Sequence, residues 1–117
     1  MQFNKGDIIT GLKTRHPIIY IEDIDNSTFR ACIITHANDE QYSDNIRMNN
    51  AHFKESDEHG NTFEISYDET FFVSKCLIKE NDWGPYEKKG ELTPEGIEYV
   101  ERIIENKRAI YWDFYVG

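Results

Sequence analysis

The chain has little cysteine and little proline, and it lacks the short motifs of common metal and nucleotide sites. It contains two cysteines and three prolines in 117 residues. Two cysteines far apart in sequence cannot build the disulfide framework of a small secreted domain, so buried free thiols are the simplest interpretation of Cys32 and Cys76. There is no Cys-X-X-Cys pair, no His-Glu-X-X-His motif and no phosphate-binding glycine loop. We therefore expect neither a metal site nor a cofactor.

Long apolar runs are also missing. No segment approaches the roughly 20 apolar residues that a membrane-spanning helix requires. Residues 1–7 do not combine a basic start with a following apolar region, as a signal peptide would. These absences predict a cytoplasmic protein that makes no contact with a membrane.

Basic residues are scarce relative to acidic ones. The chain has 13 Lys and Arg against 22 Asp and Glu, a formal net charge of -9. An acidic protein repels the phosphate backbone unless its basic residues cluster. The first 50 residues are the least acidic part and include Lys13, Arg15 and Arg30. The composition argues against a strong non-specific nucleic-acid binder but leaves room for a local positive patch.

Two apolar runs form the centre of the chain. Residues 18–21 and 29–35 are rich in β-branched side chains, and the turn-prone residues 25–27 lie between them. We predict two neighbouring central strands that bring the start of the first beside the end of the second. That arrangement gathers four polar side chains on one rim of a small β-barrel: Arg15, His16, Thr35 and His36.

The rest of the chain predicts a mainly β fold with one helix. Residues 6–11, 63–67 and 70–78 read as further strands, and the polar, Asn-rich residues 38–50 as a surface loop. A helix is predicted from Pro94 to about residue 108, with Thr93 as N-cap. With 38% hydrophobic residues, the 117 residues suffice for one folded domain spanning 1–117. The aromatic tail, residues 109–117, is expected to pack on the body or on a second subunit.

Three segments resemble the MazF/PemK family of toxins in their order and spacing. Residues 6–9 followed by 16–19 are similar to the family's Gly-Asp strand and its Arg-Pro-apolar strand. Residues 31–35 resemble the strand that ends in the family's functional Thr, and residues 73–95 its strand, turn and helix start. The resemblance implies an SH3-like barrel with a C-terminal helix. It also implies a metal-independent endoribonuclease, in which the ribose 2′-hydroxyl attacks the phosphate and leaves a cyclic phosphate and a 5′-hydroxyl.

The family's Arg before Pro and its Thr at the strand end match His16 and Thr35 here. The chain departs from the pattern because His16 precedes Pro17 and Arg15 stands one place earlier. We assign charge stabilisation at the phosphate to Arg15, proton transfer to His16 or His36, and positioning to Thr35. Each assignment has a plainer alternative, in which His16 caps a strand and His36 is an ordinary surface residue.

The resemblance implies partners as well. Single-stranded RNA would be the substrate, a homodimer would build the RNA groove across its two-fold axis, and an antitoxin protein would block that groove. Two other interpretations stay open. One is a non-catalytic barrel that binds or regulates another protein, which the net charge of -9 and the transposed Arg15 and His16 favour. The other is a small domain with a ligand in the mouth of the barrel.

Overall fold

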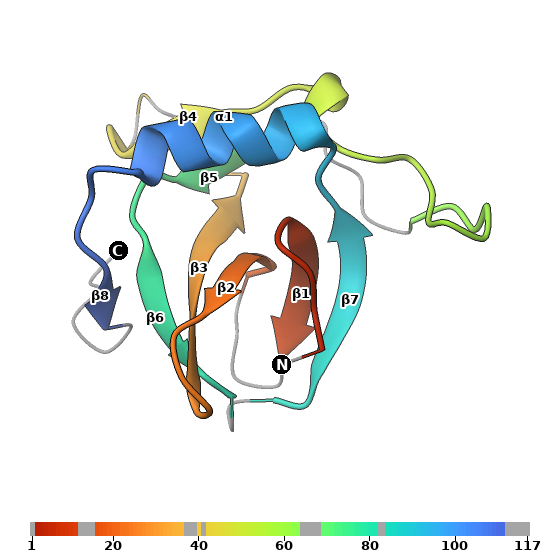
Figure 1. Ribbon diagram of the computed structural model, residues 1–117. Helices are drawn as coiled ribbons and strands as arrows, with labels where there is room; N and C mark the ends of the chain where they lie inside the picture. The colour runs from red at the N-terminus through yellow and green to blue at the C-terminus, as the bar shows by residue number, and fades with distance from the viewer. Residues whose placement is uncertain are drawn as a thin grey trace.

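The protein is mainly β with one helix packed across the strands (Figure 1). The structure is a computed structural model that describes residues 2–11, 16–36, 40, 42–63, 69–81 and 84–111. In chain order the elements are β1 (Asp7–Gly11), β2 (Ile18–Asp23), β3 (Thr28–Thr35), β4 (Asn45–Arg47), the 3-10 helix η1 (Asn50–His52), β5 (Phe71–Val73), β6 (Leu77–Glu80), β7 (Tyr86–Glu91), α1 (Pro94–Ile104) and β8 (Ile110–Tyr111). Within these residues no helix is long and apolar enough to span a membrane.

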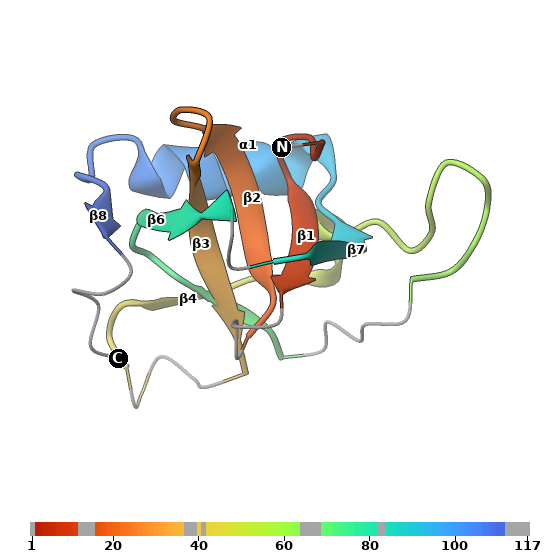
Figure 2. The same ribbon diagram turned by 90° about the horizontal axis from the view of Figure 1, so that it is seen from below.

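The sheet is organised around β3. The strands follow the order β4-β5-β3-β2-β1-β7, all antiparallel to their neighbours, and β6 also pairs with β3. Figure 2 shows β3, β2 and β1 side by side in the middle of the sheet. Along one edge β3 pairs with β2; along the other it pairs with β6 at its start and β5 at its end. The short β8 lies parallel to β6. The predicted pair of central strands is thus confirmed.

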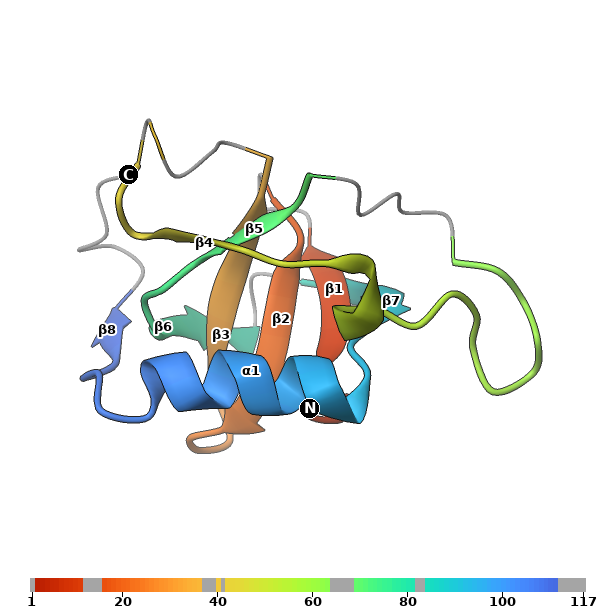
Figure 3. The same cartoon turned by 90° about the horizontal axis from the view of Figure 1, so that it is seen from above.

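Both faces of the sheet are apolar, which explains why residues 18–21 contain no charged side chain. Side chains on the helix face pack with Val100 and Ile104 of α1, which crosses the strands (Figure 3). The opposite face, called the far face below, carries a second buried cluster. Neighbouring residues alternate between the two: Cys32 and Ile34 lie on the helix face, Ala31 and Ile33 on the far face.

Helix α1 begins where the sequence predicts and ends earlier. The backbone N–H of Gly96 donates to the Thr93 hydroxyl at 3.1 Å, which confirms Thr93 as the N-cap. The helix ends at Ile104, whereas the prediction extended it to about residue 108. Residues 105–108 are all exposed, so continuing the helix would bury no further apolar surface.

The predicted loop over residues 38–50 is wrong in its second half. Asn45–Arg47 forms β4 and Asn50–His52 forms η1. Strand β4 exists because β5 offers it an edge, with Ile46 paired to the fully buried Phe72. A polar strand of this kind depends on its partner more than on its own propensity.

The single strand predicted over residues 70–78 is two strands. Ser74 and Lys75 interrupt it, with the Lys75 N–H bonded back to the Val73 carbonyl at 2.7 Å. The break lets β5 and β6 pair with different ends of β3. Lys79, predicted to terminate the strand, lies inside β6 and is fully buried. Residues 64–67 of the strand predicted over 63–67 fall outside the described residues, as do Arg15 and most of the aromatic tail.

Candidate functional site

The end of the β2–β3 pair brings predicted site residues together. Ile18 is the partner of Ile33, and the N–H of Ile34 donates to the carbonyl of Pro17 at 2.9 Å. His16 lies at a bend just before β2, and the antiparallel register, extended one residue beyond Pro17 and Ile34, would set it opposite Thr35. Thr35 follows Ile33 by two residues in β3 and therefore lies on the far face, and a residue opposed to it would share that face.

The same cross-strand row continues through two further strands. Thr35 is the partner of Phe71 in β5, and Phe71 is the partner of Arg47 in β4. The row therefore reads His16, Thr35, Phe71, Arg47, and we call these four residues the rim row. The guanidinium carbon of Arg47 lies 4.9 Å from the centroid of the Phe71 ring, an attractive cation–π contact.

Charge and burial vary along the rim row in a simple way. His16 and Arg47 at its two ends are exposed. Thr35 and Phe71 between them are 9% and 1% exposed. The row therefore presents an imidazole and a guanidinium on either side of a recessed hydroxyl.

Arg47 is held by more than its ring contact. The hydroxyl of Tyr99 in α1 donates to the carbonyl of Arg47 at 2.8 Å. The backbone of β4 is thus anchored to the helix on one side and to β5 on the other, and the guanidinium itself contacts the Phe71 ring. Sequence reasoning missed Arg47 because it assigned this segment to a loop. The alternation of Ile46 and Met48 with polar neighbours was the signal that could have found it.

The other predicted residues are placed less completely. His36 follows the last residue of β3 and is exposed at the same end of the strand as Thr35. Arg15 lies outside the described residues. Of the four predicted site residues, the structure thus places His16, Thr35 and His36 at one rim, and it adds Arg47.

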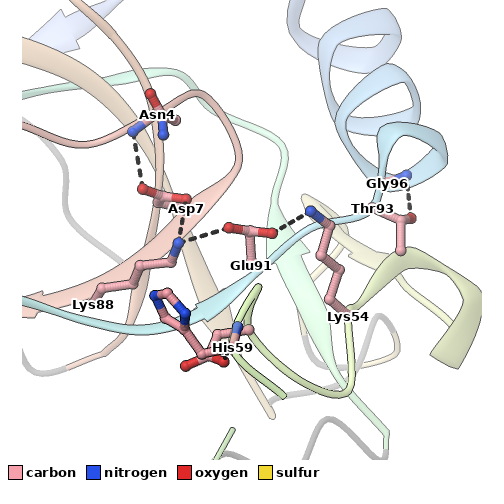
Figure 4. A network of polar contacts seen from close by, with 9 residues as sticks. Asn4, Asp7, Lys54, His59, Lys88, Glu91, Thr93 and Gly96 are labelled. Carbon is pink, nitrogen blue, oxygen red and sulfur yellow. Dashed lines mark hydrogen bonds and ion pairs between the residues drawn. The ribbon is translucent and has the colours of Figure 1, made fainter. Parts of the chain in front are cut away.

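A second polar cluster joins the start of β1 to the end of β7 (Figure 4). The amine of Lys88 lies 3.2 Å from Asp7 Oδ1 and 2.6 Å from Glu91 Oε1, and the other oxygen of Glu91 pairs with Lys54. Burial opposes the charged form of Glu91, but the hydrogen bonds from Lys54 and Lys88 lower its pKa overall. The backbone N–H of Asn4 adds a hydrogen bond of 2.9 Å to Asp7. The charges of two lysines neutralise those of two carboxylates, so we interpret this cluster as a structural connection between β1 and β7.

One buried amine also lies on the far face. Lys79 is the partner of Phe29, at the opposite end of β3 from Thr35. Burial lowers the pKa of Lys79 to about 7. Its position separates it from the rim row, so we give it no role there.

The rim row offers the groups that act on a phosphate ester. A guanidinium can bind two phosphate oxygens, an imidazole can transfer a proton near neutral pH, and a hydroxyl can donate a hydrogen bond. Among the residues that the structure describes, no group of three or more His, Cys, Asp or Glu could hold a metal ion. No family model matches the chain, and no curated protein is similar enough in sequence to count as a relative.

Proposed function

We propose that the protein is a MazF/PemK-like endoribonuclease, a toxin of a toxin–antitoxin system that cleaves single-stranded RNA without a metal ion. The observation that carries the proposal is the register of β2 on β3, which, extended past Ile18 and Ile33, would set His16 opposite Thr35. The Ile34 N–H···O=C Pro17 hydrogen bond of 2.9 Å supports that pairing. These two positions match the family's functional pair.

The chemistry needs one base, one acid and one cation. The 2′-hydroxyl oxygen attacks phosphorus, a new P–O2′ bond forms and the P–O5′ bond breaks, which leaves a cyclic phosphate and a 5′-hydroxyl. One of His16 and His36 accepts the 2′ proton, and the other gives a proton to the departing 5′ oxygen. Thr35 donates a hydrogen bond to a phosphate oxygen, and Arg47 stabilises the charge that develops there. Arg15, next to His16 in sequence, is a second cation for the same phosphate.

The arrangement of the strands supports an SH3-like barrel. Strand β3 is shared by β2, β5 and β6. The register shifts between Tyr20 and Glu22 in β2, and between Ile8 and Ile9 in β1. Bulges of this kind bend strands and increase their twist, as a small barrel requires. The proposal further expects a homodimer, which sedimentation would detect, and an antitoxin partner that blocks the rim.

The test is cleavage of a long single-stranded RNA in EDTA, with the product ends mapped. We expect discrete cuts with 5′-hydroxyl ends, and a rate lower by about 10²- to 10⁴-fold in His16→Ala, which loses a proton-transfer group. Thr35→Val and Arg47→Met should each lower the rate by about 10²-fold, because each removes stabilisation of the transition state. Arg15→Ala belongs in the same series.

Two matched variants serve as controls. His59→Ala removes an exposed imidazole in the turn over residues 57–61, and Arg102→Met removes an exposed guanidinium on α1. Both should cleave at the wild-type rate. Full activity in His16→Ala and Thr35→Val, with their folding verified by circular dichroism, would contradict the assignment of the rim row.

A second candidate is a non-catalytic barrel that binds another protein. It is favoured by the 9% exposure of Thr35, which leaves little of its hydroxyl open to a substrate, and by the net charge of -9. Intact RNA at high protein concentration would select this candidate. A pull-down with rim-row variants as the comparison would then ask whether a protein partner binds at the same rim.

A further inference from the structure

Two cysteines far apart in the sequence meet in one buried cluster. Cys32 and Cys76 are both free, both 0% exposed and both packed on the helix face of the sheet. Ala31 in β3 is the partner of Leu77 in β6, and Cys32 and Cys76 are the next residues along each chain, so extending this ladder by one pair would set them opposite each other. Opposed residues in an antiparallel pair have Cα atoms about 4.5 or 5.5 Å apart. Both spacings fall within the range of roughly 4.4–6.8 Å that a disulfide accepts.

An arginine distinguishes the two thiols. The Nε of Arg30 donates to the sulfur of Cys76 at 3.0 Å. The guanidinium is a charged hydrogen-bond donor, so this contact sets the sulfur of Cys76 apart from that of Cys32. Burial, with the nearby Cys76, raises the pKa of Cys32 and keeps it a thiol. The geometry therefore separates an attacking sulfur, Cys76, from a second thiol placed to react with its product.

The same arginine reaches from the buried sulfur to the surface. The side chain of Arg30 is 27% exposed and forms an ion pair with Glu22, whose side chain is 48% exposed. Because Arg30 also donates to the Cys76 sulfur, this ion pair connects the buried sulfur to the surface of the protein. The backbone of Cys76 stays fixed meanwhile, because its carbonyl accepts a 2.9 Å hydrogen bond from Ile110 of β8.

We propose that Cys76 and Cys32 form a dithiol site that hydroperoxides oxidise to an intramolecular disulfide. In the first step the Cys76 sulfur, after giving up its proton to water, attacks one peroxide oxygen. An S–O bond forms, the O–O bond breaks, and the second oxygen leaves as hydroxide, so peroxide is reduced and sulfur is oxidised to a sulfenic acid. In the second step the Cys32 sulfur attacks the Cys76 sulfur. The S–S bond forms, the S–O bond breaks, and the hydroxide departs with the Cys32 proton as water.

The experiment treats the folded full-length protein with hydrogen peroxide and reads the products by intact mass after denaturation and alkylation. We expect the wild type to lose two hydrogen atoms, to become resistant to alkylation at both sulfurs, and to recover both thiols with dithiothreitol. Cys32→Ala should stop at the sulfenic acid of Cys76, which dimedone traps. Cys76→Ala should leave Cys32 as a thiol, because the sulfur that Arg30 contacts is gone.

The role of Arg30 has its own comparison. Arg30→Met keeps the cover over Cys76 but removes the charged donor, and it should slow the first step by about tenfold. Arg102→Met, which removes a guanidinium that does not touch sulfur, should react at the wild-type rate. An unchanged rate in Arg30→Met overturns its assignment.

The wild-type measurement alone can overturn the site. The proposal is overturned if both thiols stay fully alkylatable after an exposure that oxidises free glutathione completely. It is also overturned if the disulfide that forms joins two chains. Neither result depends on how well a cysteine variant folds, and neither bears on RNA cleavage.

Discussion

At the scale of single residues, His52 shows how a buried side chain depends on its protonation state. Its Nδ1 accepts a hydrogen bond of 3.1 Å from the N–H of Asn49, and its ring stacks on Tyr99 with centroids 4.3 Å apart. An imidazole that accepts at Nδ1 must be unprotonated at that nitrogen. Burial lowers the pKa of His52 below its ordinary value, although Glu95 opposes the shift.

This arrangement predicts a loss of stability in mild acid. The unfolded chain protonates His52 near pH 6.5, while the folded protein resists protonation until lower pH. Well above pH 6.5 His52 is unprotonated in both states, so the folded and unfolded protein bind the same number of protons there. As the pH falls from 6.5 through the folded pKa, the unfolded state binds more, so the free energy of unfolding decreases. Urea denaturation at a series of pH values would measure it.

His52→Gln is the informative comparison for this pH dependence. Glutamine at this position can accept the same backbone hydrogen bond but does not titrate. The difference in unfolding free energy between wild type and variant should therefore change below pH 6.5 and stay flat above it. Parallel curves across the whole range would refute the role given to His52.

Some residue-level features follow from local sequence and others do not. Thr93 before Pro94, and the positions of His16 and Thr35 at the ends of apolar runs, are local signals, and they predict a cap and a shared rim. The burial of Lys79 has no local signal, because it depends on β6 lying between β3 and β8. Arg47 joins the rim row only through two strand pairings that connect distant parts of the chain.

At the scale of elements, the packing of α1 on η1 rests on the absence of one side chain. A Cβ at Gly96 would overlap with the carbonyl oxygen of His52. That carbonyl also accepts a 2.9 Å hydrogen bond from the N–H of Thr93, so it cannot move away without loss. The helix start and η1 are therefore locked at close approach.

Gly96→Ala should destabilise the protein even though alanine is the better helix former. The intrinsic gain of about 1 kcal/mol is outweighed by an overlap with backbone, and we expect a net loss of about 1–3 kcal/mol in unfolding free energy. Chemical denaturation would measure the loss. Glu98→Ala, an exposed change on the same helix, should cost less than about 0.5 kcal/mol. Increased stability in Gly96→Ala would show that η1 can move away from the added methyl group at little cost.

Element boundaries were predictable where a chain segment carries its own pattern. The turn over residues 25–27 was correct because Asp25 accepts hydrogen bonds from the N–H groups of Ser27 and Thr28, both at 2.8 Å. The division of residues 70–78 into β5 and β6 was missed because an apolar run does not reveal which partner each half will meet.

At the scale of the whole molecule, charge is the dominant surface property. A net charge of -9 on 117 residues repels itself, whereas exposed ion pairs such as Lys5–Glu101 contribute only about 0–1 kcal/mol each. Salt screens both effects, with a Debye length of about 10 Å at 0.1 M. The repulsion acts over the whole surface. Screening it with salt should therefore stabilise the folded protein by more than the weakening of the ion pairs destabilises it.

Thermal unfolding should therefore occur at a higher temperature when NaCl is raised from about 0.02 to about 0.5 M. Calorimetry at pH 7 would measure the change, with sodium chloride preferred to sulfate, which stabilises most proteins by other means. A midpoint that falls with salt would mean that the surface ion pairs outweigh the repulsion.

The central position of β3 has a consequence for the order of folding. Its hairpin with β2 closes across the short turn at residues 25–27, but its other edge needs residues 71–80. Closing that larger loop costs more chain entropy, and contacts between distant residues slow folding. During synthesis the hairpin emerges from the ribosome long before β5 and β6. The nascent chain must then carry an apolar strand with one open edge, the kind of intermediate that chaperones protect from aggregation.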